Sequence, residues 1–172
     1  MKYDIKNRFT DRVQFTAEID CREDAFEAVK VGMAVRWAVK TGADLRYTDL
    51  QDANLEGADL QHVDLQHSDL EGARLQGARL QGARLQGARL WYSDLRHSDL
   101  RHSDLEDANL RYTNLQDADF GGANLQGANL QGANLEGANL QGANLEDANL
   151  RYTNLQDADF GGAIEELKGV NR

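Results

Sequence analysis

One pattern recurs every five residues through most of the chain, and it constrains the fold more than any other feature. Each unit has a small residue, a polar residue, a leucine and two variable positions. Twenty-four units run without a gap over residues 43–162, and 22 of their central residues are leucine, the exceptions being Phe120 and Phe160. Such an internal repeat decides the fold before the propensities of single residues do.

A five-residue period fits neither an α-helix of 3.6 residues per turn nor a strand that alternates every two residues. It predicts a chain that turns a corner after each unit and points a leucine inward each time. Four corners close a square coil of 20 residues, so the 24 units predict six coils. Stacked coils would pair as parallel strands about 4.8 Å apart, giving a rod about 29 Å long. The buried leucines, at ~1.5–3 kcal/mol each, would stabilise it most.

Units such as Ala-Asn-Leu-Gln-Gly at 123–127 and Ala-Asp-Leu-Arg-Tyr at 43–47 resemble the pentapeptide-repeat family, whose units read A-(D/N)-L-x-x. The resemblance covers 120 of the 172 residues. It implies an all-β fold, a right-handed quadrilateral parallel β-helix. Parallel crossovers favour the same hand on general grounds.

The last residue of each unit varies in step with the first residue of the next. Ala follows Gly or Asp, whereas Ser, Thr or Val follows Tyr or His. Glycine tolerates a positive φ that a bulky residue avoids, so we expect two turn types at the corners.

Residues 1–42 lie outside the period, and we expect them to form a small α+β capping segment over the first coil. Residues 3–6 and 12–19 alternate as strands of a hairpin would. Asp20 and Glu23 form a capping box that predicts a helix over about 21–40. Its expected apolar stripe comprises Phe26, Val29, Met33 and Trp37. Gly42 lies where a helix is expected to stop.

The tail, residues 163–172, has Ile164, Leu167 and Val170 at a spacing of three. Two interpretations stay open. The tail either covers the last coil as a short cap, which we favour, or forms a homodimer contact of the kind that the family resemblance implies.

Two features favour a designed or consensus sequence over a natural one. Residues 105–123 recur letter for letter as 145–163, and the units are unusually uniform. In addition, four consecutive corners carry arginine where Asp or Asn is usual, at Arg74, Arg79, Arg84 and Arg89. Each arginine is expected to stack on at least one carboxylate one coil away. Recent duplication would also produce the exact repeat.

The net charge of −10 disfavours direct binding to nucleic acid, which normally needs a basic excess. No apolar stretch approaches the ~20 residues that cross a bilayer, and Met1 to Arg8 do not resemble a signal peptide. A single cysteine, Cys21, is typical of a reducing compartment. We therefore expect a cytoplasmic protein without a membrane anchor.

The pattern predicts no catalytic, cofactor-binding or metal-binding residue. Only His62 and His102 among the four histidines share a corner, two coils apart, whereas zinc ligands lie about 2 Å from one point. Cys21 has no basic neighbours to activate a thiol. Four serines are expected to point inward: Ser68, Ser93, Ser98 and Ser103. The aromatic residues are expected to pair across adjacent coils, Tyr92 with Tyr112, Trp91 with Arg111, and Tyr47 with His67.

These observations favour a non-enzymatic solenoid scaffold without a cofactor or an evolved ligand. The family resemblance implies an alternative: some members imitate the charge and shape of duplex DNA and bind DNA gyrase or topoisomerase IV. Residues 43–162 carry 20 acidic residues and nine arginines, which suits that alternative, whereas the ring of arginines interrupts the negative surface. A third hypothesis is a general platform for protein partners.

Overall fold

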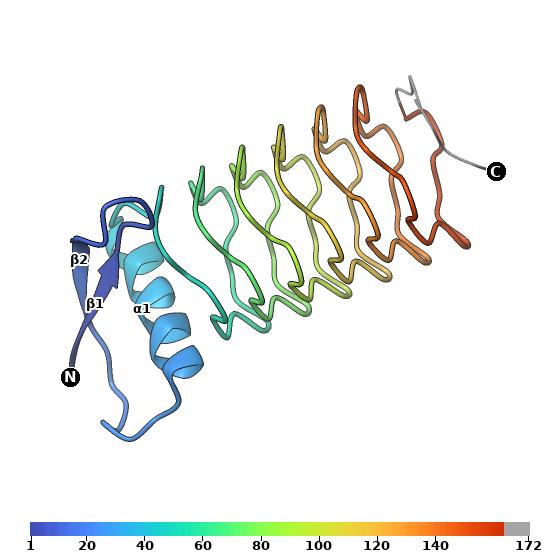
Figure 1. Ribbon diagram of the computed structural model, residues 1–172. Coiled ribbons are helices and arrows are strands. Elements are labelled where there is room, and N and C mark those ends of the chain that lie inside the picture. The colour runs from blue at the N-terminus through green and yellow to red at the C-terminus, as the bar shows by residue number, and fades with distance from the viewer. Residues whose placement is uncertain (164–172) are drawn as a thin grey trace.

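The structure is a computed structural model that describes residues 1–163. A hairpin and a helix lie at one end of a rod of stacked coils (Figure 1). Parallel backbone pairing joins each unit to the unit 20 residues further on, from Asp49 with Asp69 to Asn139 with Asp159. The coil of 20 residues predicted from the five-residue period is therefore confirmed.

The interior of the rod is a column of leucines. The central residues of every unit from Leu45 to Leu150 are at most 3% exposed, and Phe120 fits the same column at 0%. The small residues two positions earlier also face inward, and nearly all of them are buried. In the last coil Leu155 and Phe160 are only half-buried, because no described coil follows them.

All corners use one turn, so the expectation of two turn types is wrong. The last residue of every unit has a positive φ, from 55° at Tyr112 to 70° at Gly132. From Leu50 to Phe160, each corner also closes with a bond from the next unit's first N–H to the carbonyl of the central residue, as from Ala53 to Leu50 at 3.2 Å. A positive φ at the third turn position defines a type II turn.

The small residue after a Tyr or His corner has a different role from the one expected. Except at Val63, its hydroxyl donates to a leucine carbonyl oxygen, as in Thr48 Oγ1 to Leu45 at 2.7 Å and Ser98 Oγ to Leu95 at 2.6 Å. Thr113 Oγ1 instead donates to Leu90 in the coil before, at 2.8 Å. The buried hydroxyls are thus satisfied inside the rod. Ser and Thr therefore occupy the same inward site as Ala, in the same turn type.

The N-terminal hairpin forms as the sequence predicts. Strands β1 (Lys2–Lys6) and β2 (Val13–Glu18) are antiparallel, with Tyr3 opposite Ala17. The N–H of Asp49 donates to the carbonyl of Lys6 at 2.9 Å, and the N–H of Arg8 to the carbonyl of Tyr47 at 2.8 Å. The hairpin therefore joins the first coil through its backbone.

Helix α1 (Glu27–Thr41) begins later than predicted and buries only part of the expected stripe. The Asp20–Glu23 capping box is wrong, because the N-cap residue is Phe26 and no side chain caps the helix. Phe26 is 84% exposed and Val29 36%, whereas Met33 and Trp37 are half-buried and pack against the core. The helix does stop at Gly42, whose φ is 74°. Its buried residues are Val31, Gly32, Ala34, Val35 and Ala38.

Small side chains let α1 approach the first coil closely. The N–H of Asn54 donates to the carbonyl of Ala28 at 2.9 Å. The Arg36 guanidinium donates to the carbonyls of Asn54 and Glu56 at 3.2 and 3.1 Å. These contacts occupy backbone groups of the first coil that have no earlier coil to pair with.

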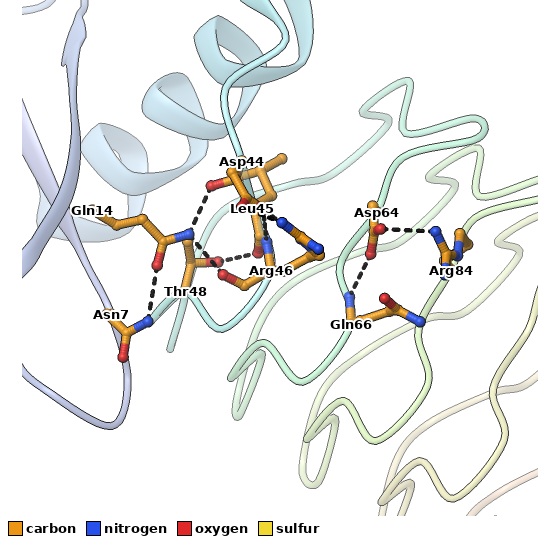
Figure 2. A network of polar contacts seen from close by, with 9 residues as sticks. All are labelled: Asn7, Gln14, Asp44, Leu45, Arg46, Thr48, Asp64, Gln66 and Arg84. Carbon is orange, nitrogen blue, oxygen red and sulfur yellow. Dashed lines mark hydrogen bonds and ion pairs between the residues drawn. The ribbon is translucent and has the colours of Figure 1, made fainter.

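The hairpin contributes a side-chain clamp to the same coil (Figure 2). Gln14 Nε2 donates to the carbonyls of Asp44 and Arg46 at 2.8 and 2.7 Å, while its Oε1 accepts from Asn7 Nδ2 at 3.1 Å. The start of the rod is thus held by both elements. The expected C-terminal cap or dimer contact at Ile164, Leu167 and Val170 lies outside the described residues. Among described residues, no helix is long and apolar enough to span a bilayer.

Candidate functional site

The polar residue before each leucine fixes the following corner. Its side-chain oxygen accepts from the backbone N–H two residues on, as Asp64 does from Gln66 at 3.2 Å (Figure 2). In the later coils this residue is usually asparagine, and its amide also donates to the coil before. Asn144 Nδ2 donates to Asn124 Oδ1 at 3.2 Å, and Asn124 Nδ2 to Asp104 Oδ1 at 3.0 Å. These amides form a ladder along the rod.

Arginine replaces this acceptor in four consecutive units and pairs with the preceding coil instead. Arg79, Arg84 and Arg89 reach Asp59, Asp64 and Asp69 at 3.2, 3.1 and 3.0 Å. The predicted stacking on carboxylates is therefore found for these three arginines. Exposed ion pairs contribute only about 0–1 kcal/mol each. The ring of arginines is a neutralised belt that connects adjacent coils.

Arg74 departs from the predicted pairing. Its guanidinium contacts Glu56 at 3.1 Å, whereas Asp94, the expected partner, pairs with Arg96 at 2.7 Å. Arg96 lies two residues after Asp94 in the same corner, so it reaches the carboxylate without spanning a coil. The backbone register alone does not predict that Arg96 competes with Arg74 for the Asp94 carboxylate.

Asp99 is held by two side chains, one from its own corner and one from the preceding coil. Arg101 Nη2 contacts Asp99 Oδ2 at 2.7 Å, and Gln81 Nε2 donates to the same oxygen. The Arg101 hydrogen bonds hold the pKa of Asp99 below its usual range, and partial burial opposes them. Such a carboxylate is stabilised in its charged form and is poorly suited to proton transfer near neutral pH.

The histidines and the cysteine lie where solvated or structural side chains would. His97 Nδ1 is 3.7 Å from Asp117 Oδ2, and Cys21 Sγ is 3.7 Å from Met1 Sδ. Within residues 1–163, no three His, Cys, Asp or Glu side chains gather into a set that could hold a metal ion. The inward serines are buried and donate to leucine carbonyls; they are Ser68, Ser93, Ser98 and Ser103.

Aromatic rings stack across adjacent coils, as the sequence predicts. Tyr92 and Tyr112 have ring centroids 5.3 Å apart and planes within 11° of parallel. Tyr47 and His67 stack in the same way at 5.1 Å, and Phe9 of the hairpin lies 6.1 Å beyond Tyr47. These contacts fasten coils to one another and, through Phe9, to the N-terminal hairpin.

One corner of the rod combines such rings with arginines, and we call it the Arg–Tyr edge. Arg111 lies over the ring of Tyr112 at 5.3 Å, and Arg89 lies over that of Trp91 at 5.1 Å. The sequence at steps of 20 residues pairs Tyr92 with Tyr112 and Trp91 with Arg111, and a further step of 40 residues adds Arg151 and Tyr152. Its members are Trp91, Tyr92, Arg111, Tyr112, Arg151 and Tyr152.

The sequence profile of the pentapeptide repeats matches this chain in overlapping segments that run from residue 41 to residue 164. The chain is a pentapeptide-repeat protein. The right-handed quadrilateral β-helix implied by the resemblance is the fold of this family. Pentapeptide-repeat proteins are generally non-catalytic.

Solved pentapeptide-repeat structures resemble the rod. Rfr23, from the cyanobacterium Cyanothece 51142, is 31% identical with a TM-score of 0.55, over 65% of this chain and 90% of that one. A pentapeptide-repeat protein from the Arabidopsis thaliana thylakoid lumen is 35% identical with a TM-score of 0.53, over 54% of this chain and 65% of that one. No curated protein sequence matches this chain. These structural relatives are natural proteins, and none of them supports a designed origin.

Proposed function

We propose that this pentapeptide-repeat protein is a non-enzymatic solenoid scaffold. The observation that carries the proposal is the filled interior: leucines and small residues occupy the axis, and the inward hydroxyls bond to leucine carbonyls. The outward polar side chains pair along the rod, as in the asparagine ladder and the arginine belt. The rod itself thus offers regular faces and a rigid length.

The designed or consensus origin remains part of this proposal and rests on the sequence alone. Its support is the exact recurrence of residues 105–123 as 145–163. The single cysteine, Cys21, similarly supports our expectation of a reducing compartment such as the cytoplasm.

A second candidate function is DNA mimicry directed at gyrase or topoisomerase, and the distribution of charge favours it. Residues 103–162 carry ten acidic residues and two arginines, a net charge of −8. Three coils span about 14 Å, since the coils are ~4.8 Å apart. Duplex DNA carries one charge per ~1.7 Å, or about eight over the same length. The first three coils, residues 43–102, carry only −3, because seven arginines offset ten acidic residues.

A gyrase supercoiling assay with a large molar excess of the protein separates the two functions. The scaffold predicts undiminished supercoiling. DNA mimicry predicts inhibition that weakens with added salt, because exposed charges are screened.

Matched charge variants make this assay specific. Replacing Asp107, Asp117, Asp147 and Asp157 with asparagine should remove inhibition, and asparagine tolerates the positive φ at these corners. Arg79→Gln with Arg84→Gln makes the second and third coils more negative and should strengthen the inhibition. Inhibition that is the same in both variants as in the original protein would count against DNA mimicry.

A further inference from the structure

We propose that the Arg–Tyr edge is a docking site for an acidic, proline-rich peptide segment in the polyproline II conformation. The inference goes beyond the scaffold role, which needs no ligand. It rests on the charge, exposure and spacing of one corner of the rod.

The edge is an exception to the acidic surface. The fourth and fifth positions of its units in coils three to six contain no acidic residue, although the whole rod carries 20. Arg111 and Arg151 also have no ion-pair partner among residues 1–163, whereas Arg96 and Arg101, at the same position in neighbouring units, are both paired. Two unneutralised guanidinium groups on one edge favour an anionic partner.

Exposed aromatic rings lie beside these charges. Tyr92 is 59% exposed, Tyr112 45% and Tyr152 86%. The Arg111 guanidinium lies over the ring of Tyr112, 5.3 Å from its centroid, so a charged donor group accompanies the rings. Aromatic surfaces with nearby donors are the usual setting in which proline-rich segments are recognised.

The spacing of the arginines selects the conformation of the ligand. Backbone bonds from Tyr112 to Gln131 and from Gly132 to Arg151 place Arg111 and Arg151 two coils apart along one corner. Two coils span about 9.6 Å. In polyproline II, residues i and i+3 share a face and lie about 9.3 Å apart, at ~3.1 Å per residue. A β-strand places same-face residues about 6.7 or 13 Å apart, which does not match.

Fluorescence anisotropy with labelled peptides tests the proposal on the full chain. A (Glu-Pro-Pro)₄ peptide should bind, and added salt should weaken its binding. (Glu-Gly-Gly)₄ has the same charge and spacing without the stiff conformation and should bind at least several-fold more weakly. (Lys-Pro-Pro)₄ should not displace labelled (Glu-Pro-Pro)₄ from the edge, even if it binds the acidic faces of the rod.

Arg111→Gln with Arg151→Gln should weaken (Glu-Pro-Pro)₄ binding about tenfold. Arg96→Gln with Arg101→Gln makes the same change in charge at the same repeat position and should leave the affinity unchanged. Circular dichroism of both pairs checks that the rod remains folded. The proposal is overturned if both pairs bind equally well, if (Glu-Pro-Pro)₄ does not bind, or if single-stranded oligothymidine binds the edge in its place.

Discussion

Gly32 of α1 lies so close to Asn54 of the first coil that a Cβ at position 32 would be 2.0 Å from the Asn54 carbonyl oxygen. The obstacle is backbone, which cannot rotate away as a side chain can. The helix and the rod are therefore matched to each other at this point.

Gly32→Ala should destabilise the protein by about 1–3 kcal/mol, the usual cost of overpacking. The sign of the change in stability is diagnostic, because replacing Gly with Ala inside an unobstructed helix stabilises a protein by about 0.5–1 kcal/mol. Urea unfolding followed by circular dichroism measures the change. Lys40→Ala, on the exposed side of the same helix, is the control and should have little effect. A gain in stability for Gly32→Ala would contradict the observed packing.

Leu130→Lys should abolish cooperative folding, whereas Gln131→Lys should leave the melting curve nearly unchanged. Leu130 is 0% exposed in the middle of the column, and an unpaired charge there is far costlier than on the surface. Thermal melts of the two neighbouring variants make the comparison. Equal stability would show that leucine does not point inward.

Gly132→Ala should cost more stability than Gly142→Ala. Both glycines have a positive φ, of 70° and 66°, so both variants pay about 1–2 kcal/mol for an alanine in that conformation. At position 132 a Cβ would also lie 2.6 Å from the ring of Tyr112, while position 142 has no neighbour closer than 4.0 Å. Chemical denaturation measures both. Adding Tyr112→Ala to each variant should reduce the difference, and a difference that persists would point to another cause.

Arg101→Gln should raise the pKa of Asp99 toward its ordinary value of 3.8. Because the folded-state pKa is lowered, this interaction stabilises the fold fully above the unfolded-state value and is lost as pH falls through the folded-state value. Its loss therefore occurs below about pH 4. Carboxyl-carbon NMR titration of Asp99 tests the shift, with Arg111→Gln on another corner as the control. An unchanged pKa in Arg101→Gln would assign the effect to the donors that remain, the backbone N–H of residue 101 and the amide of Gln81.

The coil could be predicted from the sequence because its signal is periodic. Leucine keeps its phase through 22 units, and only one geometry returns it to the axis every five residues. The turn type was harder to predict. His, Tyr and Asp occupy the left-handed region at 13 corners, which residue preference alone disfavours, because the closing backbone bonds of each coil outweigh that cost.

The face of α1 could not be chosen from its own sequence. Phe26, Val29, Met33 and Trp37 form a regular apolar stripe, yet Phe26 and Val29 are exposed, because the face that approaches the first coil most closely is that of Gly32. That selection depends on a coil more than 20 residues away. At the Arg–Tyr edge the sequence predicts the cross-coil pair of Tyr92 with Tyr112, but not the contact of Arg89 with Trp91, because that contact depends on side-chain conformations within one unit.

The asparagine ladder gives the rod a direction. Asn144 donates to Asn124, and Asn124 to Asp104, so each amide points back toward the N-terminal hairpin and helix. A coil leaving the ribosome therefore meets its side-chain acceptors in the coil made before it, and the rod can lengthen in the order of its synthesis.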